Sequence, residues 1–218
     1  MRIRNPARAL GLAAVVAGLA LLPVASAGAE TAADSSQLSV TGGSLSFNAA
    51  PNVPSMGTLT LNGEAQTLTA QLPNWSVSDA TGSGSGWNVS VQGDSGEGKS
   101  AVFKEYCAVA EKCTVGYVAG GKALSANSLT LTSSGAAFGG LNETTGTGPT
   151  HSCASTCSVD SATAVKVAAA AEGTGMGTWQ AETYGASSLQ LAAPTTVEAL
   201  GEGEVYRADL LWTLSSGP

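Results

Sequence analysis

The clearest pattern in this chain is the alternation of apolar and polar residues near its C-terminal end. Apolar side chains fall at every second position, which is the period of a β-strand with one buried face. This face consists of Tyr206, Ala208, Leu210, Trp212 and Leu214. A second strand of the same kind lies upstream, where Trp87, Val89 and Val91 share one face. We expect both tryptophan strands to bury these faces.

The rest of the chain alternates short apolar stretches with Gly, Asn, Pro and Ser residues. Such spacing is typical of an all-β sandwich or barrel. We predict a single antiparallel β-sandwich domain over residues 38–218, after a flexible lead-in over residues 30–37. The predicted strands are Leu38–Val40, Leu45–Asn48, Met56–Leu61, Gln66–Ala70, Trp75–Asp79, Trp87–Gln92, Ser128–Thr132, Val165–Ala169, Trp179–Thr183, Leu189–Ala192 and Glu204–Leu214.

Residues 93–160 differ from this pattern, because they contain all four cysteines and several Gly/Ser/Thr runs. We interpret them as an elaborated insertion between core strands. Within it, Val102, Tyr106 and Val109 recur at helical spacing, so a short helix is predicted over Ser100–Cys113.

The N-terminal residues resemble a secretory signal peptide. Three arginines precede an apolar run, Ala9–Val24, which small residues follow. The run is shorter than the roughly 20 apolar residues that span a bilayer. We therefore predict export, with cleavage after Ala27 or Ala29, and no membrane attachment after cleavage.

The predicted mature chain is strongly acidic. The signal peptide holds three of the nine basic residues and none of the sixteen acidic ones, so six basic residues remain and the net charge becomes −10. This balance argues against a nucleic-acid partner. Four residues follow Leu214 and none of them forms an apolar anchor, so we expect non-covalent attachment at the cell surface.

Four cysteines in an exported chain predict two disulfides. Three pairings are possible, and the short spacings favour Cys107 with Cys113 and Cys153 with Cys157. The alternative is a zinc site that includes His151. The spacings C-x5-C and H-x-C-x3-C fit zinc knuckles poorly, so we expect disulfides and no metal.

Two motifs suggest catalysis or nucleotide binding. Gly93–Ser100 fits the phosphate-loop pattern G-x4-G-K-[ST], but acidic residues within the loop would repel phosphate. Gly93–Gly96 is similar to the nucleophile loop of trypsin-like proteases, yet the single histidine, His151, follows the serine. The acidic residues show no pairing typical of a glycosidase. We expect no catalytic residues and no cofactor.

Three further segments form a set. The first is D-x-x-G-x-G-x-G-W-x-V, from Asp79 to Val89, with glycines Gly82, Gly84 and Gly86. The second is the turn Gly175-Met176-Gly177, and the third is Y-x3-L-x-W-x-L-x3-P, from Tyr206 to Pro218. Together they resemble the WxL family of Gram-positive bacterial surface proteins. Val89 stands where leucine is usual in that family.

This resemblance implies non-covalent attachment to the cell wall, through peptidoglycan, and association with other bacterial surface proteins. The alternative is a structural or adhesive subunit that binds other proteins and reaches the wall only through them.

The roles of Trp87 and Trp212 follow from their faces. A tryptophan can stack on a sugar ring. Each of these two, however, shares its face with aliphatic residues of the same strand. We therefore favour a core role for both over direct contact with a ligand.

Overall fold

The structure is a computed structural model that describes residues 34–218, and Val40–Pro218 form one compact unit. The predicted signal peptide lies outside the described residues. Residues 34–218 form an all-β fold without helices, so none of them provides a helix that could cross a membrane. The strands are β1 (Leu45–Ala49), β2 (Gln66–Ala70), β3 (Trp75–Asp79), β4 (Trp87–Gly93), β5 (Lys104–Cys107), β6 (Gly116–Tyr117), β7 (Leu129–Leu131), β8 (Ala137–Leu141), β9 (Thr150–His151), β10 (Cys157–Ser158), β11 (Val165–Ala170), β12 (Gly177–Glu182), β13 (Leu189–Ala193), β14 (Glu204–Arg207) and β15 (Leu210–Ser216).

The strands form four antiparallel sheets, which we name by one edge strand each. The β1 sheet has the order β1-β3-β12-β8, and the β15 sheet has the order β15-β4-β11-β9. The β2 sheet has the order β10-β7-β13-β2, and the β14 sheet has the order β14-β5-β6.

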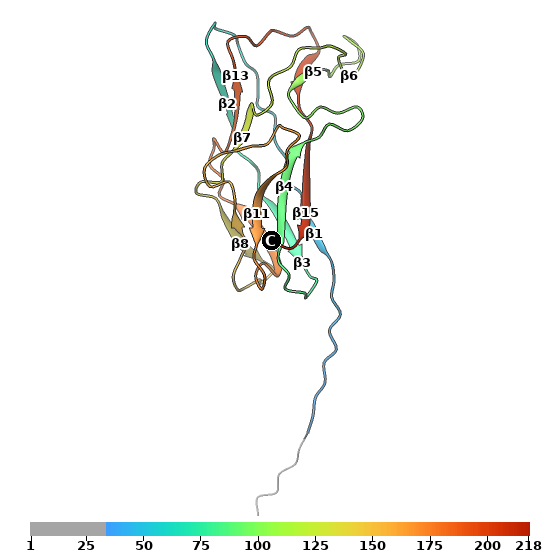
Figure 1. Cartoon of the computed structure of the whole chain (residues 1–218), viewed down its shortest axis with the longest axis vertical. Coiled ribbons are helices and arrows are strands. Elements are labelled where there is room, and N and C mark those ends of the chain that lie inside the picture. Colours follow the sequence, from blue (N-terminus) through green and yellow to red (C-terminus); the bar gives the residue numbers. More distant parts are fainter. Residues whose placement is uncertain (1–33) are drawn as a thin grey trace, which may run out of the picture. The chain divides into compact units, whose positions relative to one another are not determined.

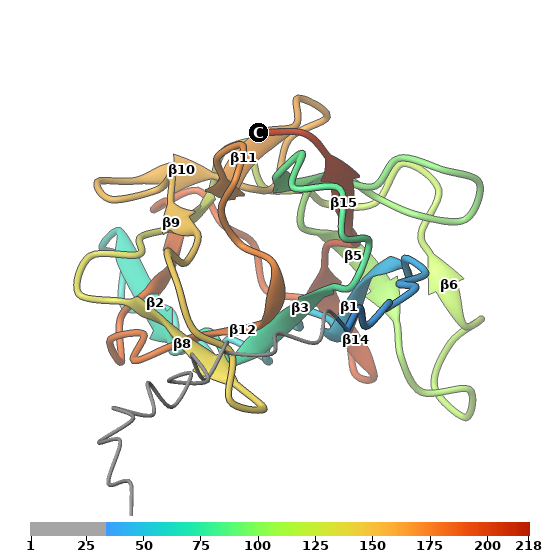
Figure 2. The ribbon, with the colours of Figure 1, turned by 90° about the horizontal axis from the view of Figure 1, so that it is seen from below.

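The four sheets make up two layers, because the same chain segments run from one sheet into the next. Short connections join β2 to β3, β7 to β8 and β12 to β13, so the β2 sheet extends the β1 sheet. In the other layer, two residues join β14 to β15, so the β14 sheet extends the β15 sheet (Figure 1). At one end the edges meet, with β1 beside β15 and β8 beside β9, and the strands surround a common interior (Figure 2).

The core fills this interior. Along β4, buried and half-buried residues alternate, so that Trp87, Val89 and Val91 all face inward. From the opposite layer, Trp75 and Val77 of β3 meet them, each at most 1% exposed. Burying these side chains removes a large apolar area from water, which is the main stabilising contribution in a domain of this size.

Most predicted strands are confirmed, including Trp87–Gln92, but the predicted strand Glu204–Leu214 is divided at residues 208–209 into β14 and β15, which belong to different sheets. Two are wrong. Leu38 and Val40 are 89% and 81% exposed and pair with no strand. Met56–Leu61 crosses from β1 to β2 without joining a sheet. Apolar alternation alone does not create a strand where no neighbouring edge is available.

The predicted helix over Ser100–Cys113 is also wrong. Lys104–Cys107 instead forms β5, between β14 and β6. Tyr106 explains the preference, because its ring packs edge-on against Tyr117 at 5.0 Å and lies under the Arg207 guanidinium at 4.5 Å. These cross-strand contacts outweigh a weak helical pattern.

The segment 93–160, which we interpreted as an insertion, contributes strands β5 to β10. Two of them continue the main layers, since β7 pairs with β13 and β8 pairs with β12. Leu129 and Leu131 of β7 are each 1% exposed. This segment is therefore built into both sheets of one layer.

Candidate functional site

The two tryptophan strands are direct neighbours in the β15 sheet. Strand β15 pairs antiparallel with β4, so that Trp212 lies opposite Val91 and Leu214 lies opposite Val89. On the other side of β4, Ala170 of β11 lies opposite Trp87. The proximal and distal motifs, whose residues Trp87 and Trp212 are 125 positions apart in sequence, thus lie on neighbouring strands of one sheet.

The motif side chains differ in burial. Trp87 and Val89 are fully buried. Trp87 also donates a hydrogen bond from Nε1 to the carbonyl oxygen of Gly175, at 3.0 Å, which satisfies the indole N–H inside the core. The distal residues are half-buried and pack on the edge of the core; they are Tyr206, Leu210, Trp212 and Leu214.

The motif glycines have a backbone conformation that other residues rarely adopt. All five have positive φ, and they are Gly82, Gly84, Gly86, Gly175 and Gly177. At Gly86 a Cβ atom would lie 2.3 Å from the carbonyl oxygen of Ala170, and at Gly175 it would lie 2.9 Å from Nε1 of Trp87. These two glycines are needed both for their dihedral angles and for close packing around Trp87.

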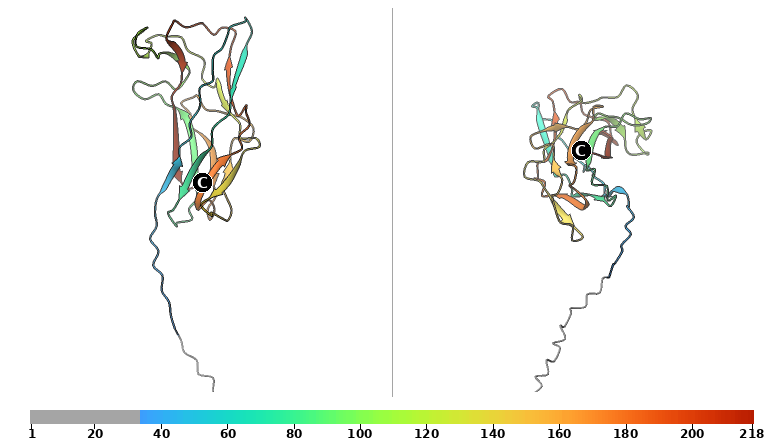
Figure 3. Two further views of the ribbon diagram at one scale, coloured as in Figure 1. Left: turned by 180° about the vertical axis from the view of Figure 1, so that it is seen from behind. Right: turned by 60° about the horizontal axis from the view of Figure 1, so that its bottom comes forward.

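Main-chain hydrogen bonds tie the motif segments together at one end of the domain. The N–H of Gly173 donates to Gly84 O at 2.7 Å, and the N–H of Gly217 donates to Gly86 O at 3.0 Å. The left-hand view of Figure 3 shows the C-terminus toward this end of the strands. We call this region, formed by residues 79–87, 171–177 and 215–218, the motif end.

The motif end carries a row of hydroxyl groups. Thr81 Oγ1 and Ser83 Oγ are 2.9 Å apart, and Ser83 Oγ and Ser85 Oγ are also 2.9 Å apart. The row continues onto the distal motif, with 3.1 Å between Ser85 Oγ and Ser216 Oγ. Thr81, Ser83 and Ser85 stand at every second position, which places their side chains on the same side of an extended chain. The glycines between them, Gly82 and Gly84, have positive φ. We call these four residues the hydroxyl row.

Asp79 sets the direction of the hydrogen bonds in this row. Its carboxylate can only accept, so Thr81 Oγ1 donates to Asp79 Oδ1, at 2.7 Å. Each hydroxyl has one proton, so Ser83 then donates to Thr81 and Ser85 donates to Ser83. The backbone N–H groups of Ser83 and Ser85 occupy further lone pairs. Open acceptor sites therefore remain at the far end of the row, on Ser85 and Ser216.

The loop with the phosphate-loop pattern has a structural role in this protein. The ammonium group of Lys99 donates to Asp94 Oδ2 at 2.5 Å, and this bond holds the pKa of Asp94 below its usual value. Main-chain bonds dock the loop on the distal motif: Asp94 N–H donates to Asp209 O at 2.7 Å, and Asp209 N–H donates to Ser100 O at 2.8 Å.

Asp209 links β14, β15 and this loop. Burial raises the pKa of Asp209, but hydrogen bonds from Tyr117 and Arg207 outweigh burial, so the pKa lies below its usual value. Tyr117 donates its hydroxyl to Oδ2 at 2.6 Å, and Arg207 donates from Nη2 to Oδ1 at 2.7 Å. The ionised carboxylate thus fixes the junction at which the distal motif passes from one sheet to the next.

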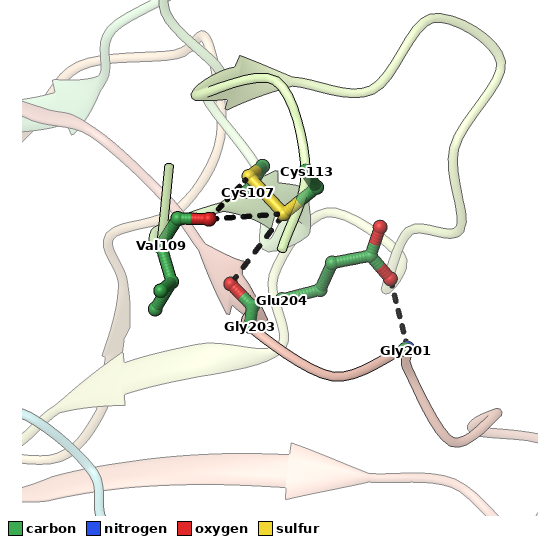
Figure 4. The surroundings of a disulfide bond; sticks show 6 residues. All are labelled: Cys107, Val109, Cys113, Gly201, Gly203 and Glu204. Atoms are coloured by element: carbon green, nitrogen blue, oxygen red, sulfur yellow. Dashed lines mark hydrogen bonds between the residues drawn. A yellow bond between two sulfur atoms is a disulfide. The ribbon is translucent and has the colours of Figure 1, made fainter. Parts of the chain in front are cut away.

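The cysteines form the two local disulfides favoured by their spacing, Cys107–Cys113 and Cys153–Cys157. The Cys113 sulfur lies 3.8 Å from Gly203 O, just before β14 (Figure 4). His151, the alternative zinc ligand, is stacked on Phe138 at 4.4 Å. Within residues 34–218, no group of three His, Cys, Asp or Glu side chains could hold a metal ion.

Sequence reasoning found the tryptophans and the motif glycines but missed the hydroxyl row. The signal was present: Thr81, Ser83 and Ser85 occupy the positions between the motif glycines. Only the structure shows that Ser216, 131 residues beyond Ser85, completes the row.

Residues 29–218 match the family described as "WxL domain surface cell wall-binding". No curated protein and no solved structure matches the chain. The family match covers nearly the whole chain and includes the strands, glycine turns and terminal segment that meet at the motif end. The chain therefore belongs to the WxL family of cell wall-binding surface domains.

Proposed function

We propose that this domain attaches non-covalently to peptidoglycan and that the motif end makes the contact. The observation that carries the proposal is the hydroxyl row, which joins the proximal and distal motifs at the surface. Trp87 is fully buried and presents no surface to a ligand. The role of the buried tryptophan strand is then to hold the row in place.

The chemistry of the row suits a glycan. Sugar hydroxyls donate hydrogen bonds, and Ser85 and Ser216 have acceptor sites left open by the bonds that begin at Asp79. A chain of hydrogen bonds polarises its members, which strengthens the terminal acceptors. Within the motif end, Met176 is 45% exposed and offers an apolar contact to the C–H face of a sugar. We infer that the glycan strands, rather than the peptide stems, are recognised.

We also propose that the protein is exported with its signal peptide removed and that it binds the wall without breaking it. The family is described by binding and not by an activity. The mass of the secreted protein identifies the cleavage position. Incubation with purified wall should release no soluble sugar, and release of sugar would show an enzyme instead.

The decisive experiment is sedimentation of the mature protein with purified, protein-free peptidoglycan. We expect the protein to sediment with the wall and to be recovered by denaturant with its mass unchanged. The S85A/S216A double variant should bind at least tenfold more weakly, because each lost bond to a sugar hydroxyl contributes about 1 kcal/mol.

The matched control is S134A/S187A, which removes two exposed serine hydroxyls outside the motif end. It should bind like the wild type. If the wild type fails to bind protein-free peptidoglycan, direct attachment is wrong, and the protein reaches the wall through other surface proteins. If the wild type binds and S85A/S216A binds equally well, the wall contact lies elsewhere on the domain.

A further inference from the structure

A second surface lies between the β2 sheet and the β14 sheet, where the edges of the two layers do not meet. It is a groove of about 820 Å³, a size typical of ligand sites in proteins. The groove is bounded by β2, by β14 and by the segment 51–61. Its apolar lining includes Met56, Leu59, Leu68, Phe103, Leu191 and Trp212.

The main chain around this groove has free hydrogen-bonding groups. Among the described residues, β2 pairs only with β13 and β14 pairs only with β5, so each presents an open edge. The segment 51–61 runs between the two layers (Figure 3, left). Its N–H and C=O groups bond to no other main-chain group within residues 34–218. Side chains occupy two of them: Gly57 N–H donates to Ser55 Oγ, and Thr60 O accepts from Gln66 Nε2. Open edges of this kind accept an added strand.

The charge of the groove is negative. Its lining carries three carboxylates, from Glu198, Glu204 and Asp209, and one guanidinium, from Arg207. Arg207 is bound to Asp209, and Lys122 reaches Glu198 from outside the lining at 3.5 Å. Within residues 34–218, no cation pairs with the carboxylate of Glu204, whose Oε2 accepts the N–H of Gly201 at 2.8 Å. An incoming chain with basic side chains would complement it.

We propose that this groove binds an extended segment of another protein by strand addition. The segment has apolar side chains at alternate positions, which enter the groove, and basic residues between them, which face the carboxylates. This inference is independent of wall binding, since the hydroxyl row lies at the motif end and contributes no residue to the groove.

A second copy of this chain is a poorer occupant. The exposed residues 34–40 of such a copy do carry Leu38 and Val40 at alternate positions. However, residues 34–40 include Asp34 and no basic residue, so they would bring negative charge to a negative groove. Charge therefore favours a foreign, basic segment.

The test uses the mature protein and an eight-residue synthetic peptide with valine at alternate positions and lysine or threonine between them. Titration calorimetry should show binding, with NMR shifts at the amides of β2, β14 and 51–61. A peptide N-methylated on its pairing edge should bind at least tenfold more weakly, because it cannot form the ladder. Replacing lysine with glutamate should weaken binding similarly.

Two variants distinguish peptide binding in the groove from nonspecific binding to exposed apolar side chains. Leu61 lines the groove and is 47% exposed, whereas Leu211 is 44% exposed and lies outside the groove. L61R should abolish peptide binding and L211R should leave it unchanged, while both retain the wild-type melting temperature. The proposal is wrong if the lysine peptide does not bind, if N-methylation has no effect, or if the groove is filled by self-association in sedimentation velocity.

Discussion

The two motif tryptophans have different environments, although their sequence patterns are alike. Trp87 lies in the middle of the core and its indole N–H is bonded to Gly175 O. Trp212 lies on the edge strand β15, is half-buried, and lines the groove. The alternation that marks an inward face does not show whether the strand is central or at an edge, so the sequence could not separate these roles.

We expect W87A to lose about 3–5 kcal/mol of the free energy of unfolding, because it removes a fully buried aromatic side chain. W212A should lose about 2 kcal/mol, since part of its ring is already in water. Urea denaturation of both variants measures the difference. Equal losses would mean that Trp212 is buried as deeply as Trp87.

Asp160 is a buried carboxyl group outside the motifs. It is 0% exposed, and its Oδ2 accepts the N–H of Ser128 at 3.0 Å. Its Oδ1 has no hydrogen-bond partner within residues 34–218. Burial raises the pKa of Asp160 to about 6, although several backbone N–H groups oppose this.

A raised pKa means that the folded state favours the protonated acid. The stabilisation from Asp160 is therefore complete below its unfolded pKa near 4 and is lost as pH rises through about 6. His151 opposes this trend, because burial lowers its pKa. The effect of Asp160 is therefore measured as the difference in the free energy of unfolding between D160N and the wild type at each pH.

We predict that D160N gains about 2 kcal/mol in the free energy of unfolding, relative to the wild type, between pH 4 and pH 7. Urea denaturation at the two pH values measures this gain. A difference that does not change with pH would show that Asp160 titrates normally in the folded protein.

At the scale of elements, the sequence identified strands that alternate cleanly and missed those that do not. Strands β2 and β3 were predicted with their observed bounds. Strand β8, with the sequence AFGGL, has two glycines, and its two large apolar side chains, Phe138 and Leu141, are three positions apart, so the sequence shows no alternation there. Strands β9 and β10 have two residues each and depend on partners distant in sequence.

Part of the candidate site could also be predicted from the sequence, and part could not. The motif tryptophans and glycines follow from strand pattern and from the family resemblance. The hydroxyl row and the groove do not, because both depend on residues from separate segments, such as Ser85 with Ser216 and Leu59 with Trp212.

The two disulfides should stabilise different elements by similar amounts. They close loops of six and four residues, and each should contribute about 2 kcal/mol by restricting the unfolded chain. C107A/C113A should speed amide exchange in β14, because the first disulfide packs against Gly203. C153A/C157A should act on β7 and β10, which pair next to the second disulfide. Hydrogen exchange with mass spectrometry distinguishes the two patterns.

At the scale of the whole domain, the motif end and the groove occupy opposite ends of the strands. Strand β15 shows this directly, since Ser216 lies in the hydroxyl row and Leu210 lines the groove. The two proposed contacts, with the wall at the motif end and with a partner in the groove, are therefore compatible with each other.

We predict that a small folded domain fused after Pro218 blocks sedimentation with peptidoglycan, because it covers the motif end. The same domain inserted between Asn62 and Gly63, in an exposed turn before β2, should leave sedimentation intact. Unchanged melting temperatures would confirm that both fusions are folded. If only the insertion at Asn62 blocks binding, the wall contact lies at the groove end.

The strand order also has a consequence for folding during export. Each of the four sheets contains β12, β13, β14 or β15, so none is complete until residues beyond 176 are available. Closing such long loops is entropically costly and makes folding slow. If the protein is exported as we propose, a chain that emerges with its N-terminus first would stay without complete sheets, and thus able to pass through a secretion channel, until these late strands arrive. Strand β15 therefore both carries the distal motif and is needed to complete the sheet that contains Trp87.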